Sequence, residues 1–157
     1  MKLSLKAKRG LLVIHCIFAA IMLGNMVVFL IFSITISASN QQTIIEACQQ
    51  GMHLLSRTSV KASTIGTTVT GILLSVWSKW GLFKFYWIIA KEGLTVLCIA
   101  INFWGMYAWT LAALQQKSAD ELFIVHAELW TGIIIQILSL VLMYVLSVFK
   151  PWGRRVA

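Results

Sequence analysis

The stretch WIIAKEGLTVLCIAINFWGMYAWTLAAL, residues 87–114, decides the fold of this chain. It is long and apolar enough for a helix to cross the hydrocarbon core of a bilayer, which takes about 20 residues. Polar or small side chains recur along it at intervals of four and three: Lys91, Thr95, Cys98, Asn102 and Gly105. This spacing places them on one helical face. Because an unpaired amide or ammonium in lipid costs several kcal/mol, the face should turn toward other helices.

The composition indicates a membrane protein. The chain has 157 residues, of which 59% are hydrophobic and only 11% are charged. Soluble domains carry about 25% charged residues, so much of this surface should face lipid instead of water. The length allows about four spans with short connections, and we therefore expect one integral membrane domain over residues 1–157.

We expect an all-α fold, a four-transmembrane-helix bundle with spans at about 11–37, 54–77, 87–114 and 122–149. The first two spans are separated by the polar segment 39–57, in which five apolar residues fall close to one helical face: Ile44, Ile45, Cys48, Met52 and Leu55. This pattern predicts an amphipathic outer segment before the second span. In the first span, Ala20 and Gly24 are four residues apart, which predicts close approach of a second helix.

The net charge of +8 is distributed unevenly. Nine cations fall on one side of the four-span arrangement: Lys2, Lys6, Lys8, Arg9, Lys79, Lys84, Lys150, Arg154 and Arg155. Only Arg57, Lys61 and Lys117 fall on the other side. This asymmetry predicts a multi-pass membrane protein with both termini in the cytoplasm. No basic patch alternates with exposed aromatics, so we expect no nucleic-acid partner.

The antiparallel order of the spans predicts three polar layers. His15 and Lys91 should lie about 6 Å inside the cytoplasmic boundary, at 1.5 Å per residue. Amides and hydroxyls should meet near the middle of the bilayer, and His53, His126 and Glu128 toward the outer face. We call the predicted interior set the polar seam: Asn25, Thr67, Thr95, Asn102, Glu128 and Gln136.

Each layer has a functional and a structural interpretation. In the inner layer, a charged residue within a span indicates a functional site, and a histidine there can ligate heme iron or relay a proton. Alternatively, Lys91 reaches the interface and His15 bonds to a carbonyl. The central layer can line a polar path or form interhelical hydrogen bonds worth about 0.6 kcal/mol each. In the outer layer, His53 and His126 are weak candidates for a heme or metal pair.

Two stretches resemble known membrane proteins. GLLVIHCIFAAIMLGN, residues 10–25, and TGILLSVWSKWGLFKFYWIIAKEGLT, residues 70–95, are similar to an uncharacterised bacterial family of small four-helix integral membrane proteins. This resemblance implies that the protein lies in the bacterial cytoplasmic membrane. The chain more distantly resembles copper-resistance D and J-type protoporphyrinogen oxidase membrane proteins. The latter resemblance implies heme and a functional role for His15 and Lys91. The chain has no proline-arginine motif at the end of the first span, unlike the oxidases.

Three functions follow as expectations. The first is a redox protein of the membrane that holds heme or a quinone at His15, with Lys91. The second is a small transporter or ion-conducting protein that uses the polar seam as a path. The third is a structural or accessory subunit, as a homo-oligomer or with a partner membrane subunit. No soluble-enzyme motif such as GxSxG, HExxH or GxGxxG occurs in the sequence.

Overall fold

The computed structural model describes residues 4–77, 85–115 and 118–151, and every regular element in these ranges is a helix. The all-α prediction is therefore confirmed for this part of the chain. The elements are α1 (Leu5–Ala38), α2 (Gln42–Arg57), α3 (Ser59–Trp77), α4 (Tyr86–Ala100), the π-helical turn η1 (Ile101–Gly105), α5 (Met106–Leu114) and α6 (Ala119–Phe149).

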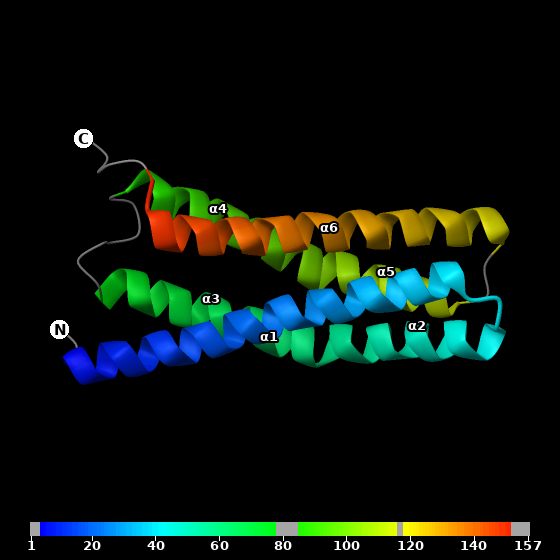
Figure 1. The fold of residues 1–157 in the computed structure, drawn as a ribbon, viewed down its shortest axis with the longest axis horizontal. Helices are drawn as coiled ribbons and strands as arrows, with labels where there is room; N and C mark the ends of the chain where they lie inside the picture. The colour runs from blue at the N-terminus through cyan, green and yellow to red at the C-terminus, as the bar shows by residue number, and fades with distance from the viewer. Residues whose placement is uncertain (1–3, 78–84, 116–117, 152–157) are drawn as a thin grey trace.

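The helices form an elongated bundle of four helical segments (Figure 1). α1 and α6 each run the length of the bundle. α2 and α3 form a second segment that is interrupted only at Thr58, and α4, η1 and α5 form one continuous segment. α1 packs along α3 and α6, and α5 packs between α2 and α6. The first and last described residues therefore lie at the same end of the bundle.

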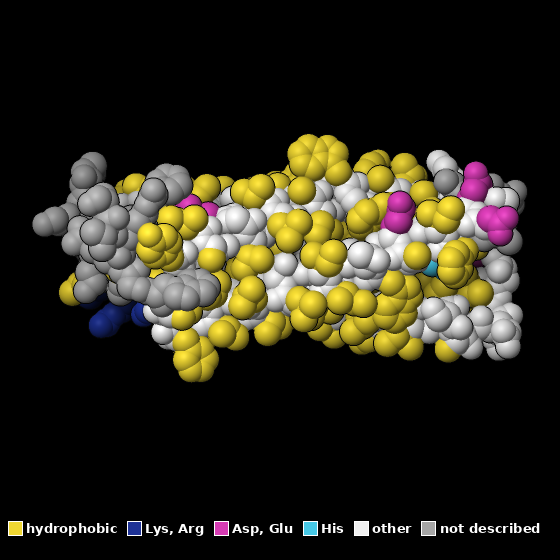
Figure 2. Space-filling view, turned by 90° about the horizontal axis from the view of Figure 1, so that it is seen from above, with side chains coloured by type: hydrophobic (Ala, Val, Ile, Leu, Met, Phe, Trp, Pro, Cys, Tyr) yellow, Lys and Arg dark blue, Asp and Glu magenta, His cyan; other side chains and the backbone are white. Residues whose placement is uncertain are grey.

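Three of these segments are long and apolar enough to cross a membrane: Leu5–Ala38, Tyr86–Leu114 and Asp120–Phe149. Apolar side chains cover much of the visible face of the bundle, and acidic side chains lie mostly near one end (Figure 2). These features indicate a membrane protein. Six of the cations behind the orientation prediction lie outside the described residues: Lys2, Lys79, Lys84, Lys117, Arg154 and Arg155.

Local capping explains where the helices differ from the predicted spans. α1 begins at Leu5 instead of residue 11, because the Ser4 side chain accepts a hydrogen bond from the Ala7 backbone N–H. α6 begins at Ala119, where Ser118 and Glu121 form a capping box. It ends at Phe149, and the C-cap residue Lys150 has a left-handed φ of 45°.

The amphipathic segment is a helix, and it continues into α3 as a packed part of the bundle. The apolar face of α2 includes buried Cys48 and Met52, as its sequence pattern indicated. Ile44, by contrast, is exposed. The helical path breaks at Thr58, with φ −113° and ψ −87°, so residues 54–57 belong to α2 and not to the next helix. Contacts with α1 and α5 hold α2 in line with the bundle axis.

Close helix approach depends on glycines other than the predicted one. A Cβ at Gly66 of α3 would lie 2.6 Å from the Phe18 ring of α1, and a Cβ at Gly132 of α6 would lie 2.6 Å from the Trp109 ring of α5. No atom would come within 4 Å of a Cβ at Gly24. The prediction that Gly24 marks a close approach is therefore wrong, because its backbone faces open space.

Gly66→Ala is expected to lower the free energy of unfolding by about 1–3 kcal/mol, because the added methyl group overlaps the Phe18 ring. Gly24→Ala is the matched control, and its better helix propensity should leave stability unchanged or raise it by up to about 1 kcal/mol. Thermal unfolding in one mild detergent, followed by tryptophan fluorescence, measures both. Equal midpoints for the two variants would contradict this account of the α1–α3 contact.

Candidate functional site: a buried polar layer

The polar face of α4 meets a complementary face of α6 in antiparallel register. The Lys91 Nζ atom donates to Ser147 Oγ at 2.8 Å, and one turn further the Thr95 hydroxyl lies 3.5 Å from the Met143 sulfur. Each step forward along α4 is thus matched by an equal step back along α6. The same register, continued into η1, brings Asn102 to about the depth of Gln136 on α6, and η1 contacts α6. Both side chains are fully buried, at 0% exposure, so the seam at these positions is shielded from lipid.

Two amide–hydroxyl hydrogen bonds tie three elements together at this depth. Asn102 Nδ2 donates to Thr64 Oγ1 of α3 at 2.7 Å, and Asn25 Nδ2 of α1 donates to Ser63 Oγ at 3.3 Å. Thr64 can only accept from Asn102, since its own proton goes to the Val60 carbonyl. We call Asn25, Ser63, Thr64, Asn102 and Gln136 the central polar layer. All five side chains are buried.

The central polar layer is not fully satisfied. The Oδ1 atom of Asn102 and both amide atoms of Gln136 are buried and have no hydrogen-bond partner. Nearby on α3, the Thr67 hydroxyl is also buried and unpaired. Burying an amide without a partner costs roughly 2–7 kcal/mol, so native proteins rarely leave a buried amide without a hydrogen bond. These atoms therefore form a place where a small polar species would be stabilised.

The π-helical turn η1 changes which residues face this layer. A π-turn adds one residue to a helical turn, and such turns occur frequently at functional sites. The spacing predicted Gly105 on the buried face, but the extra residue brings Met106 and then Thr110 there. Asn102 lies inside η1, so the irregular backbone and the unpaired amide coincide.

The other predicted seam residues differ in their placement. Thr67 and Thr95 are half-buried, and Thr95 donates its hydroxyl proton to the Lys91 carbonyl. Glu128 is exposed, so including it in the interior was wrong. The buried face of α6 follows a four-three repeat through Val125, Leu129, Gly132 and Gln136. Glu128 lies four residues before Gly132, where the repeat requires three. Its side chain therefore points about 100° away from the buried face.

The inner-layer residues bond to separate helices. His15 Nδ1 lies 2.9 Å from Thr70 Oγ1 of α3. Thr70 gives its own proton to the Gly66 carbonyl at 2.6 Å, so it accepts here and His15 Nδ1 donates. The Nε2 atom of His15 therefore keeps its lone pair in the neutral ring. No hydrogen bond joins His15 to Lys91, although the two are close enough to interact electrostatically.

His53 of α2 packs against α5. Its Nδ1 atom lies 3.2 Å from Thr110 Oγ1, and its ring centroid lies 5.6 Å from that of Tyr107. Burial, and then the positive charges of Arg57 and Lys61, lower the pKa of His53. These effects favour the neutral ring at pH 7. The contact of His53 with α5 was not indicated by sequence spacing alone.

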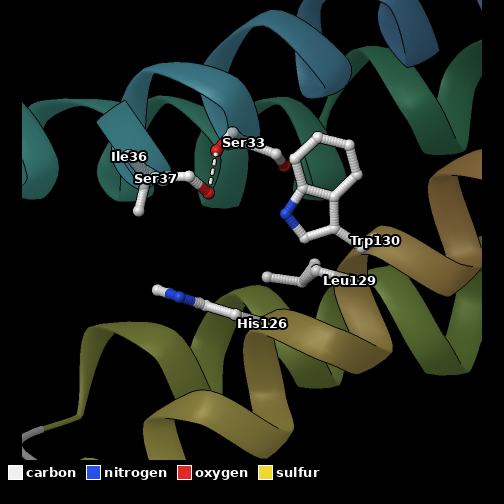
Figure 3. Close-up of a pocket in the computed structure, with 6 residues that line it drawn as sticks. All are labelled: Ser33, Ile36, Ser37, His126, Leu129 and Trp130. Atoms are coloured by element: carbon white, nitrogen blue, oxygen red, sulfur yellow. Dashed lines mark hydrogen bonds between the residues drawn. The ribbon is translucent and has the colours of Figure 1, made fainter. Parts of the chain in front are cut away.

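His126 faces a different neighbour. Together with Trp130 of α6, it lies across a small cavity from Ser33 and Ser37 of α1 (Figure 3). The cavity, about 10 Å³, has room for about one water molecule, and the His126 Nε2 atom is buried without a partner. No hydrogen bond or ring contact joins His126 to His53. In the described ranges, no three metal-ligating side chains cluster.

Comparison with protein-family models gives no match for this chain. Comparisons with curated proteins and with solved structures also give no match. The resemblances inferred from the sequence thus remain predictions. The central polar layer contains only amides and hydroxyls, which do not ionise near neutral pH. These side chains can therefore donate and accept hydrogen bonds but do not exchange protons near neutral pH.

Thr64→Val should lower the free energy of unfolding by about 1–2 kcal/mol, because the Asn102 amide then loses the one acceptor it has among the described residues. Thr131→Val is the control, since the exposed Thr131 hydroxyl bonds only to the Ala127 carbonyl of its own helix. Thermal unfolding of both variants in detergent gives the comparison. An equal loss at the two positions would show that the hydroxyl of Thr64 contributes nothing specific.

Proposed function

We propose that the protein is a small transporter or ion-conducting protein, in which Asn102 and Gln136 contact the species that crosses. The observation that carries this proposal is the set of three unpaired amide atoms at the centre of the bundle. Unpaired amide atoms buried within a bilayer are costly, whereas hydrogen bonds to a water molecule or a small polar solute would satisfy them. The π-turn at Asn102 adds to this support.

The proposal includes a fourth span, α3. Its 19 residues extend about 28 Å, close to the hydrocarbon thickness of about 30 Å. Ile65, Val69, Ile72 and Val76 are exposed along it and suit a lipid-facing surface. Its serines and threonines lower its hydropathy, yet Ser63, Thr64 and Thr70 are buried. α2 then extends beyond the bilayer, with both termini in the bacterial cytoplasm.

Polar side chains continue from the central polar layer toward both ends of the bundle. On the side of the termini lie Cys98, Thr95 and the Lys91–Ser147 pair. On the other side, the hydroxyls of Ser56 and Thr110 are 3.1 Å apart and adjoin His53. These polar side chains, taken together, offer hydrogen-bonding groups along most of the length of the bundle. An accessory subunit that binds partner helices would present such groups on its outside, but they are interior here.

Replacing either central amide by leucine should reduce flux by about tenfold, the equivalent of losing one hydrogen bond of ordinary strength. We would measure proton and potassium flux into proteoliposomes with wild type, Asn102→Leu and Gln136→Leu. Met106→Leu and Ile133→Leu are matched controls, because both side chains are fully buried on the same helical segments and the exchanges conserve volume. Flux that survives in both amide variants would refute the path.

A second function, a heme- or quinone-associated redox protein, is favoured by one specific observation. Thr70 fixes His15 with Nδ1 as the donor, which leaves the Nε2 lone pair for a ligand. Metal-binding histidines use their other ring nitrogen in this way. Heme or a quinone would supply electron transfer, with His15 as ligand or hydrogen-bond acceptor and Lys91 as a nearby positive charge.

This second function predicts that protein purified from heme-replete cells absorbs visible light and that His15→Ala removes the band. His126→Ala is the control, because His126 lies against α1 at the other end of the bundle. Absorption spectra of the oxidised and reduced protein, with quinone analysis of an organic extract, provide the measurement. A wild-type preparation that carries neither group would exclude the redox function.

A further inference from the structure

Lys91 is a half-buried cation with few partners. Its Nζ atom donates to Ser147 Oγ at 2.8 Å, and Ser147 can only accept, since its own proton goes to the Met143 carbonyl at 2.7 Å. The same Nζ atom lies 5.9 Å from the centroid of the Trp87 ring. An ammonium has three N–H donors, so two of them are not used by Ser147.

No carboxylate neutralises Lys91 within the described chain. The sequence has five acidic side chains. Four of them belong to α2 and the first turns of α6, toward the opposite end of the bundle: Glu46, Asp120, Glu121 and Glu128. Figure 2 shows acidic side chains mostly toward that end. The fifth, Glu92, is the next residue and points about 100° away around the helix. A cation at membrane depth without a counter-ion is costly, so an anion from outside the chain would stabilise it.

The surroundings of Lys91 suit a lipid better than a soluble anion. Tyr86, Tyr144, Val145 and Val148 are exposed on the same turns of α4 and α6 and offer an apolar surface to acyl chains. The exposed Tyr86 is an aromatic residue of the kind that lies at the headgroup level, whereas Trp87 is buried. Further cations at this end raise the positive potential: Lys6, Lys8, Arg9 and Lys150.

We propose that Lys91 and Ser147 form a binding site for the phosphate of an anionic phospholipid, from the leaflet at the end where the described chain starts and finishes. The phosphate oxygens accept the remaining N–H donors of Lys91, and the lipid charge neutralises the ammonium. The acyl chains lie along the exposed apolar side chains of α4 and α6. This site does not depend on the proposed transport or redox function.

The test compares phosphatidylglycerol with phosphatidylcholine of identical acyl chains. Native mass spectrometry of the detergent-purified protein counts bound lipid, and thermal unfolding measures stabilisation by each lipid. Wild type should prefer phosphatidylglycerol, and Lys91→Met should reduce this preference by about fivefold, the usual effect of one lysine near an anionic surface. Lys6→Met is the matched control, because Lys6 is exposed at the same end.

Further arms keep the test decisive. Lys91→Arg retains the charge and should keep the preference, and inorganic phosphate should not compete with the lipid if the acyl chains contribute. Wild type that binds both lipids equally would overturn the proposal even if Lys91→Met does not fold. An equal loss in Lys6→Met and Lys91→Met would also overturn it, because the effect would then belong to the overall charge. Competition by phosphate alone would identify a soluble-anion site and reject the lipid.

Discussion

The hydrogen bond from Asn102 to Thr64 sets the arrangement of the bundle. An amide cannot face acyl chains without a large cost, so this 2.7 Å contact fixes the rotation of η1 about its own axis. Once Asn102 points inward, Cys98 and Met106 must also be buried, whereas Trp104, 72% exposed, must face outward. The register with α6 then brings Gln136 to the same depth. The rotation of one helical turn thus determines which side chains the interior contains.

Packing around this contact leaves polar atoms without partners. Trp109 occupies the space beside Gly132 and Gly105, and η1 supplies the extra residue that brings Met106 into the interior. Interior space is filled closely with side chains on every side of the layer, yet Gln136 finds no acceptor or donor among them. Close packing of side chains and hydrogen bonding of polar groups compete here. The packing is close, and the Gln136 amide is left without hydrogen bonds. The unpaired amides are the basis of the proposed passage of a polar species.

The two ends of the bundle differ in charge, and the difference extends into the interior. Four of the five acids lie toward the end that carries the α1–α2 connection, and Lys91 is half-buried toward the other end. Lys91 therefore relies on a neutral hydroxyl and an aromatic ring. Two separate features result: a neutral polar layer at the centre and a cationic site near the termini. Their chemistries suit different ligands.

The sequence by itself determined the helical class, the long apolar segments and the buried face of residues 91–102, because hydropathy and a four-three spacing are local properties of the chain. It also predicted one shared depth for His15 and Lys91 and another for Asn102 and Gln136. Only the tertiary structure decided which side of each helix faces which neighbour. Glu128 proved exposed, and a Cβ at Gly24 would contact no neighbouring helix. The π-helical turn η1 shifted the buried face by one residue. Such outcomes depend on contacts between distant segments, whose rotation about the helix axis no local pattern specifies.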